Sequence, residues 1–275
     1  MENTDNAGSA DRVLSHRRAA ASMWGRGGRF YDDISFGISD ALAHAAQRLS
    51  ARAEEEILDV ATGTGWSARN VARSGARVTA VDISSELLAA AAELSAHISP
   101  PIDFQLGDAE QLLFPARSFD GVISTFGVIF AQDQQRAAGE LVRVCRQGGR
   151  LCLATWAQGG SVEEFLGIIG RHGEGPPPQA SPLIWGDPGH VEKLLGRHFE
   201  LTFEPGVNNA YHPSLDHIWE WYMRGFGPLR QLADGLDADR RTALRRDVDA
   251  YHSHYETEAG LHVKREYVIV LGRRR

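Results

Sequence analysis

The chain has 275 residues, 43% of them hydrophobic, which is enough for one large domain or for one domain with a modest second lobe. Its formal net charge of −7 argues against a nucleic-acid-binding surface, so we expect a small-molecule partner and no nucleic acid. The first ten residues are polar and small, and no later stretch has 18 uninterrupted apolar residues, so we expect no signal peptide, no membrane span and a cytoplasmic location.

The N-terminal part of the chain predicts helices. Residues 11–30 combine arginine and alanine with Met23 and Trp24 and then become rich in glycine, which predicts a short helix followed by a flexible connection. Apolar residues recur at helical spacing over 38–52 and predict a second helix. We expect residues 1–36 to form an N-terminal helical or flexible segment.

From residue 56 onward, short apolar runs alternate with helical stretches. Helices are expected over residues 67–73, 85–97 and 134–144, and each lies between two expected strands. The expected strands are 56–61, 77–81, 102–106, 119–125 and 150–156, the last entered through a Gly148-Gly149 turn. This alternation predicts an α/β fold whose doubly wound, mostly parallel sheet is covered by helices on both faces.

The pattern changes after residue 156. A stretch rich in glycine and proline, from Gly173 to Pro188, predicts a loop over the ligand edge of the sheet. The later expectations are a short helix over 190–195, a strand over 199–203, a helical insertion over 214–257 and a final strand over 266–271. We therefore expect residues 37–275 to form a single domain with lid segments at 157–198 and 208–262.

Cysteine and histidine spacing indicates no metal site. Cys145 and Cys152 lie seven residues apart, at an expected helix end and in the next strand, which suits neither a disulfide framework nor zinc; we expect buried free thiols. His252 and His254 would point about 200° apart on a helix.

The strongest motif follows the first expected strand, where Asp59-Val-Ala-Thr-Gly-Thr-Gly65 leads into a helix. Such a loop exposes backbone N–H groups to an anionic ligand, and side chains larger than glycine would block the approach. The spacing Gly63-x-Gly65-x-x-Ala68 also satisfies a dinucleotide-binding fingerprint, so the loop alone indicates only a nucleotide-like ligand. Asp59 either contacts the ligand, directly or through water, or caps the turn.

Two acidic residues follow the next strands. Asp82 closes the second strand, where its carboxylate could accept hydrogen bonds from ribose hydroxyls or cap the following helix. Asp108, in Gly107-Asp-Ala-Glu110 after the third strand, could meet an adenine amino group.

Over residues 56–156 the chain resembles the class I methyltransferases, in the ubiquinone/menaquinone-biosynthesis-like branch called methyltransferase type 11. The matching features are the glycine loop, Asp82, Gly-Asp-Ala at 107–109, Ser-Phe-Asp at 118–120 and the Gly148-Gly149 turn. Two departures are Ala61, where many members have glycine, and Gln147, where proline is usual. The resemblance implies a Rossmann-like fold whose last strand inserts antiparallel between the fifth and sixth.

The resemblance also implies that the cofactor is S-adenosylmethionine and that the product is S-adenosylhomocysteine. The binding residues that it implies are Ala61, Thr62, Gly63 and Gly65 for the methionine portion, Asp82 for the ribose, and Ile83, Asp108, Ala109 and Glu110 around the adenine. Thr125 and Phe126 begin the segment 125–130, which the resemblance places beside the sulfonium and the acceptor. Trp24 and Tyr31 resemble aromatic residues that related enzymes place over the cofactor, although such residues also fill cores.

Methyl transfer needs the acceptor atom to be aligned with the S–methyl bond and water to be excluded; an oxygen acceptor would also benefit from a base. His190 and His212 are candidates for that base. We expect a small, apolar or aromatic acceptor beneath the lid. The rival hypotheses are an NAD(P)-dependent oxidoreductase, although the sequence has no Tyr-x-x-x-Lys pair, and a cofactor-binding protein without catalysis. The sequence is compatible with a monomer and with a homodimer.

Overall fold

The computed structural model describes residues 12–173 and 181–275. Within them, one sheet holds the strands β1 (Glu56–Val60), β2 (Arg77–Asp82), β3 (Asp103–Leu106), β4 (Phe119–Thr125), β5 (Cys145–Trp156), β6 (Phe199–His212), β7 (Glu256–Thr257) and β8 (Gly260–Arg274). Their order is β3-β2-β1-β4-β5-β8-β6, with β7 paired to β8. The first five strands are parallel, and β8 runs antiparallel between β5 and β6. The Rossmann-like, mostly parallel sheet with an antiparallel last strand is confirmed.

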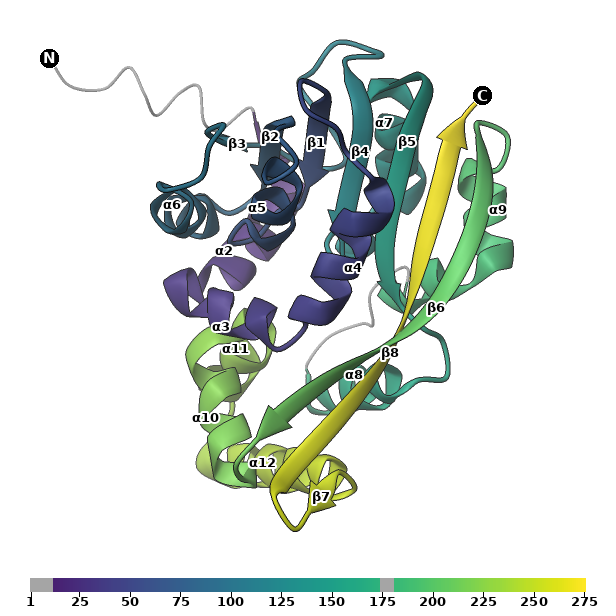
Figure 1. Cartoon of the computed structure of the whole chain (residues 1–275). Helices are drawn as coiled ribbons and strands as arrows, with labels where there is room; N and C mark the ends of the chain where they lie inside the picture. The colour runs from purple at the N-terminus through teal and green to yellow at the C-terminus, as the bar shows by residue number, and fades with distance from the viewer. Residues whose placement is uncertain (1–11, 174–180) are drawn as a thin grey trace, which may run out of the picture.

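Helices lie on both faces of this sheet, with α4 in front of it and α7 behind it in Figure 1. The α-helices are α2 (Arg18–Gly25), α3 (Tyr31–Phe36), α4 (Ser39–Leu49), α5 (Trp66–Ala72), α6 (Ser85–Leu94), α7 (Gln134–Val144), α8 (Ser161–His172), α9 (Pro188–Leu195), α10 (Leu215–Gly225), α11 (Gly227–Gly235) and α12 (Ala238–Ser253). The shorter 3-10 helices are η1 (Ser15–Arg17), η2 (Gly28–Phe30), η3 (Val128–Phe130) and η4 (Pro182–Gly186).

The central strands are apolar on both sides because helices cover both faces. Ile57, Leu58 and Val60 of β1 are fully buried, so apolar and polar residues do not alternate there. On α7, Leu141 and Val144 belong to one buried face, and the Asp133 side chain accepts a hydrogen bond from the third residue of that helix. Strand 119–125 and helix 134–144 begin and end where the sequence predicts.

The predicted start of β5 is wrong. The strand begins at Cys145 and not at Arg150, because Cys145 already pairs with Phe119 across a bulge that lies before Gly121. Gly148 has a φ of 69°, so the predicted glycine turn becomes a left-handed irregularity inside the strand. Cys145 and Cys152 are buried free thiols, as expected.

The C-terminal half differs more from the expectations. Helix α8 was not predicted, although Val162, Phe165 and Ile168 form its buried face, because the glycine- and proline-rich stretch directly after it dominates the local composition. Most of that stretch, residues 174–180, lies outside the described residues. The strands predicted over 199–203 and 266–271 are much longer in the structure, since β6 and β8 pair along their whole lengths.

Beyond the sheet, β6 and β8 continue as a two-stranded ribbon that carries α10 and α12 (Figure 1). These elements have a second hydrophobic core of their own, which includes Ile218, Leu244, Val248 and Val263. Trp219, Trp221 and Tyr222 are buried in it. The helical insertion predicted over 214–257 is confirmed as the helices α10, α11 and α12, and the ribbon strands β6 and β8 lie on either side of it in the sequence.

The glycine-rich connection after α2 is not a loose linker. A Cβ atom at Gly27 would lie 2.2 Å from the carbonyl oxygen of Gly225, and one at Gly227 would lie 2.1 Å from that of Met23. The glycines thus let two backbones approach closely, and ion pairs between Arg26 and Asp234 and between Arg224 and Asp33 lie along the same contact. The N-terminal segment is docked on α10 and α11. The predicted flexible connection is wrong.

Candidate functional site

The loop between β1 and α5 has an unusual backbone conformation. Ala61, Gly63 and Gly65 all have positive φ values, of 58°, 58° and 85°. Glycine adopts this region freely, but alanine does so at a cost of about 1 kcal/mol. The Thr62 N–H holds the loop by donating to the carbonyl of Val81, at 3.0 Å. The loop therefore lies between the carboxyl ends of β1 and β2.

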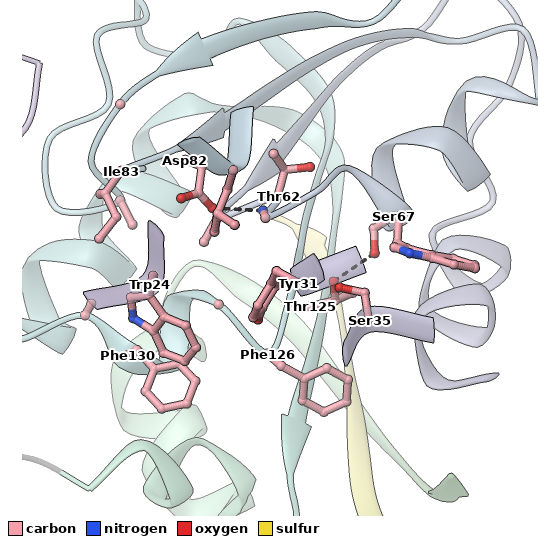
Figure 2. A pocket seen from close by; sticks show the side chains of 18 of the residues that line it. Trp24, Tyr31, Ser35, Thr62, Ser67, Asp82, Ile83, Thr125, Phe126 and Phe130 are labelled. Atoms are coloured by element: carbon pink, nitrogen blue, oxygen red, sulfur yellow. Dashed lines mark hydrogen bonds between the residues drawn. The ribbon is translucent and has the colours of Figure 1, made fainter. Parts of the chain in front are cut away.

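Asp82, at the end of β2, is held by backbone donors. One carboxylate oxygen accepts from the Gly63 N–H at 2.8 Å and the other from the Ser84 N–H at 2.9 Å (Figure 2). Burial raises the pKa of Asp82 to about 6 against these hydrogen bonds, which lower it. Each oxygen keeps a second lone pair, so the carboxylate can accept two more hydrogen bonds from the cavity that it lines.

Asp59 lies behind the loop. It is fully buried, and its carboxylate accepts from the Thr62 hydroxyl at 2.6 Å. Burial raises the pKa of Asp59 to about 7, and the nearby Asp82 carboxylate also raises it. In this structure Asp59 fixes the turn, and its side chain does not line the cavity described below.

At the end of β3, Asp108 is fully buried and accepts from the backbone N–H of Glu110 at 2.9 Å and of Leu14 at 3.3 Å. The side chain of Glu110 is directed toward the N-terminal segment. Its carboxylate contacts His16 at 2.9 Å and Arg17 at 3.3 Å. The N-terminal segment is therefore attached to the loop after β3, at the edge where Asp108 lies.

After β4 the backbone makes a tight approach to the glycine loop. Phe126 has a φ of 55°, and its ring stacks on Trp156 with the centroids 3.9 Å apart. A Cβ atom at Gly127 would lie 2.4 Å from the Cβ of Ala61. Directly before Phe126, the hydroxyl of Thr125 lies 2.8 Å from that of Ser67 (Figure 2). Strained backbone of this kind often occurs at binding sites.

Aromatic side chains close the site from the N-terminal segment. Trp24 packs against Phe130 with centroids 4.9 Å apart and edge-on against Tyr31 at 6.1 Å, as Figure 2 shows. The Tyr31 ring lies over Gly63, where a Cβ would be 3.1 Å from it. Burial, with Asp82 adding to it, raises the pKa of Tyr31 well above its ordinary value, so this hydroxyl stays protonated at neutral pH.

These elements surround one cavity, which we call the edge cavity because it lies at the carboxyl ends of β1 to β4. It brings together Trp24, Tyr31, Ala61, Thr62, Gly63, Asp82, Ile83, Asp108, Ala109, Thr125 and Phe126, all of which the sequence singled out. Gly107 of the motif after β3 also lines it, and so do Gly127 and Phe130 of the segment expected beside the sulfonium. The lining residues that the sequence did not single out are Arg17, Ser35, Ile38, Leu42, Trp66, Ser67, Leu87 and Ala131. For Trp66 and Ser67, their direct succession to the glycine loop was an available signal.

Five of the singled-out residues do not line the edge cavity. Asp59, Gly65 and Glu110 lie behind its walls. His190 is on α9, which packs against β6 and η4, and His212 lies in the second hydrophobic region near Trp221, with ring centroids 4.9 Å apart. The described residues contain no group of three or more side chains that could hold a metal ion, and no described helix has the length and apolarity needed to cross a membrane.

Comparison with known proteins agrees with this geometry. The family profile described as "Methyltransferase domain" matches residues 58–153, the span that carries the glycine loop, Asp82 and Asp108. An uncharacterised protein of Mycobacterium tuberculosis is 37% identical over 190 residues, which cover 66% of this chain and 69% of the relative. The demethylmenaquinone methyltransferase of Thermobifida fusca is 39% identical over 104 residues, 38% of this chain and 44% of that enzyme.

A solved structure shares the fold. The YcgJ protein of Bacillus subtilis superposes with a TM-score of 0.61 at 19% identity, covering 86% of this chain and 98% of that one. The family match, the relatives and the inserted antiparallel β8 lead to one assignment. The chain belongs to the class I methyltransferases of the type 11, ubiquinone/menaquinone-biosynthesis-like branch and is an S-adenosylmethionine-dependent methyltransferase.

Proposed function

We propose that the protein transfers the methyl group of S-adenosylmethionine directly to a small organic acceptor held in the edge cavity. The observation that carries this proposal is that the glycine loop, Asp82 and Asp108 line the same cavity as the aromatic side chains of the N-terminal segment. The first three provide polar groups for an adenosyl ligand, and the aromatic residues provide an apolar wall that excludes water.

The residues around the edge cavity fit the cofactor. The free lone pairs of Asp82 suit two ribose hydroxyls, Asp108 and Ala109 suit the adenine, and Ile83 and Leu87 offer apolar contact to its ring. At Gly63 the absence of a Cβ, which would lie 3.1 Å from the Tyr31 ring, keeps the loop backbone open to the methionine portion. The hydroxyls of Ser67 and Thr125 can hydrogen-bond the amino acid part.

Catalysis in this proposal depends on position. When bound, S-adenosylmethionine supplies a methyl group on a sulfonium that leaves as a neutral thioether. The methyl group would be shielded from water by the side chains of Trp24, Phe126 and Phe130, and the exclusion of water favours the transfer. Ser35, Ile38 and Leu42 line the part formed by α3 and α4, and we infer that the acceptor lies against them. The protonated Tyr31 hydroxyl acts as a hydrogen-bond donor and not as a base.

We propose further that residues 37–275 act as one methyltransferase domain, with 157–198 and 208–262 as lid segments over the acceptor. The partner is a small molecule in this proposal, and the docking of residues 23–36 on α10 and α11 makes the N-terminal segment part of the same cover. Light scattering measures the molar mass in solution and so tests whether two copies of the chain form a homodimer.

The two rival functions are distinguished from methyl transfer by different observations. An NAD(P)-dependent oxidoreductase of the usual doubly wound type does not insert its last strand antiparallel between two others, as β8 does. A protein that binds the cofactor without catalysis would share every binding residue named above, so only turnover separates it from an enzyme.

Calorimetric titration tests the function directly. We expect S-adenosylmethionine and S-adenosylhomocysteine to bind with dissociation constants of about 1–100 μM, a range typical of enzyme ligands, and NAD to give no heat. Release of S-adenosylhomocysteine in the presence of a panel of apolar and aromatic acceptors then measures turnover. Binding of NAD alone would contradict the proposal.

The acidity of Asp82 predicts a pH dependence of cofactor binding. Because the ionised carboxylate accepts the ribose hydrogen bonds and its pKa is raised to about 6, protonation competes with the ligand below that pH. We expect the affinity for S-adenosylhomocysteine to be level above pH 7 and to fall by up to about tenfold per pH unit below pH 6. In Asp82→Asn the affinity is lower throughout and this slope disappears. A slope that persists in this variant would assign the titration to another group.

A further inference from the structure

Three arginines are buried in the part of the chain that the structure describes, and two of them have acidic partners. Arg17 lies 3.3 Å from Glu110, and Arg69 lies 2.9 Å from Asp32. The third, Arg265 on β8, is 7% exposed and forms no ion pair with a described carboxylate. It donates instead to two neutral oxygens, the hydroxyl of Tyr222 at 3.2 Å and the carbonyl of Gly37 at 3.5 Å.

Two neutral acceptors do not balance this side chain. A guanidinium carries a full positive charge and five N–H donors, and burial removes the water that would otherwise solvate it. The contact to Gly37 is at the long limit of a hydrogen bond, so only the contact to Tyr222 is close. An anion is the natural partner of such a group, and a carboxylate matches its planar fork.

The residues around Arg265 offer further unused hydrogen-bonding atoms. Asn208 lies opposite Arg265 across the ribbon and donates its amide N–H to the Gly37 carbonyl at 2.8 Å, which fixes the orientation of the amide. Its Oδ1 is therefore the buried atom without a partner, and the Nε2 of His212, on the same face of β6, is also buried without one. Burial, with Arg265 next, lowers the pKa of His212 to about 3, so this imidazole is neutral.

Two residues link this cluster to the acceptor side of the edge cavity, although its own side chains are not among those that line the cavity. Gly37, whose carbonyl accepts from both Arg265 and Asn208, lies between Ser35 and Ile38, which line the cavity. On β8, Tyr267 lies two residues after Arg265 on the same buried face of the strand. Its ring meets the cavity-lining Phe126 edge-on, with the centroids 6.3 Å apart.

We propose that Arg265, flanked by Asn208 and His212, recognises a carboxylate group of the methyl acceptor and so determines which acceptors the enzyme accepts. The guanidinium and the His212 Nε2–H donate to the carboxylate oxygens, and Asn208 Oδ1 accepts from a hydroxyl or amino group beside the carboxylate. This inference rests on the proposed function for the position of the acceptor.

The test uses benzoate as the carboxylate probe and benzamide, which has the same shape without the charge. Both are titrated into protein saturated with S-adenosylhomocysteine, and the affinity for S-adenosylhomocysteine itself is measured first on each sample. The variants are Arg265→Met and, as the matched control, Arg73→Met, which removes an exposed arginine at the end of α5 that donates to the Asn70 side chain. Arg265→Lys keeps the charge but loses the planar fork.

We expect benzoate to bind the wild type and Arg73→Met, and benzamide to bind neither. In Arg265→Met the benzoate affinity falls at least tenfold, and in Arg265→Lys it falls less, as expected for the loss of a charge-assisted contact. If Arg265→Met does not fold, the lysine variant carries the comparison. Equal benzoate binding by the wild type and the folded Arg265 variants, benzamide binding as tight as benzoate, or no benzoate binding to the wild type would each overturn the inference. Failure of S-adenosylhomocysteine to bind the wild type would instead contradict the proposed function.

Discussion

Replacing Asp82 with alanine is expected to weaken the binding of S-adenosylhomocysteine by about 100-fold or more, the equivalent of losing two hydrogen bonds to a charged acceptor. The variant removes the proposed ribose acceptor. It also leaves the N–H groups of Gly63 and Ser84 without the carboxylate that now holds them at 2.8 and 2.9 Å. Because Gly63 belongs to the glycine loop, the loop loses its fixed position as well as its ligand contact.

Calorimetry on the wild type and on Asp82→Ala measures this effect, and circular dichroism verifies that the variant is folded. The matched control is Asp103→Ala on β3, which removes an exposed carboxylate whose only described partner is the Gln105 side chain. We expect Asp103→Ala to bind as the wild type does. A folded Asp82→Ala protein with unchanged affinity would rule out Asp82 as the ribose ligand.

Gly127→Ala is expected to disrupt both stability and cofactor binding. The added methyl would lie 2.4 Å from the Cβ of Ala61 and 2.8 Å from its carbonyl oxygen, closer than real Cβ contacts allow. Neither backbone yields easily, because Thr62 is hydrogen-bonded to Val81 at 3.0 Å and Phe126 to Ala154 at 2.8 Å. Overpacking of this kind costs about 1–3 kcal/mol or more, and the loop that moves is the one proposed to hold the cofactor.

Two further variants identify the cause of this loss. In the double variant Ala61→Gly with Gly127→Ala the shorter contact is gone, so we expect partial recovery of melting temperature and affinity. Gly139→Ala, in α7, places a methyl where no atom lies within 4 Å, and it should stabilise the protein by about 0.5–1 kcal/mol because alanine favours the helix. Thermal unfolding of all four proteins measures these differences. Equal melting temperatures for Gly127→Ala and the wild type would show that the backbone adjusts there without cost.

The parts of the fold that the sequence predicts are those in which local pattern and tertiary environment agree. Strands β1, β2 and β4 and helix α7 are bounded by turn residues, caps or charges. The strands are mostly apolar because both of their faces are covered, and the helix has one apolar face. The start of β5 fails because a bulge lets glycines stay in the strand. The extent of β6 and β8 fails because each pairs with the other far along the chain, which no local window contains.

The same distinction holds for the site. The glycine loop, Asp82 and Asp108 follow directly after strands, so parallel strands bring them to one edge. Ser35, Ile38 and Leu42 reach the edge cavity only because α3 and α4 pack against the sheet and the ribbon, and nothing in their immediate sequence indicates a ligand. The burial of Arg265 without an acid is a tertiary fact in the same sense, since the strand predicted from the sequence begins only at residue 266 and the pairing with β6 extends it to include Arg265.

The insertion of β8 between β5 and β6 has a consequence for the order in which the molecule can be completed. Of the strands described, β8 comes last in the sequence, yet it occupies an interior position of the sheet, between β5 and β6. Until residues 260–274 have left the ribosome, β5 remains an open edge with the apolar sequence Leu151-Cys-Leu-Ala-Thr-Trp156. Such edges pair readily with other chains. During synthesis, therefore, the nascent protein carries an unpaired apolar edge from the completion of β5 until β8 emerges. We expect its yield in cells to depend on how quickly β8 pairs with β5 or how well chaperones cover the edge before it does.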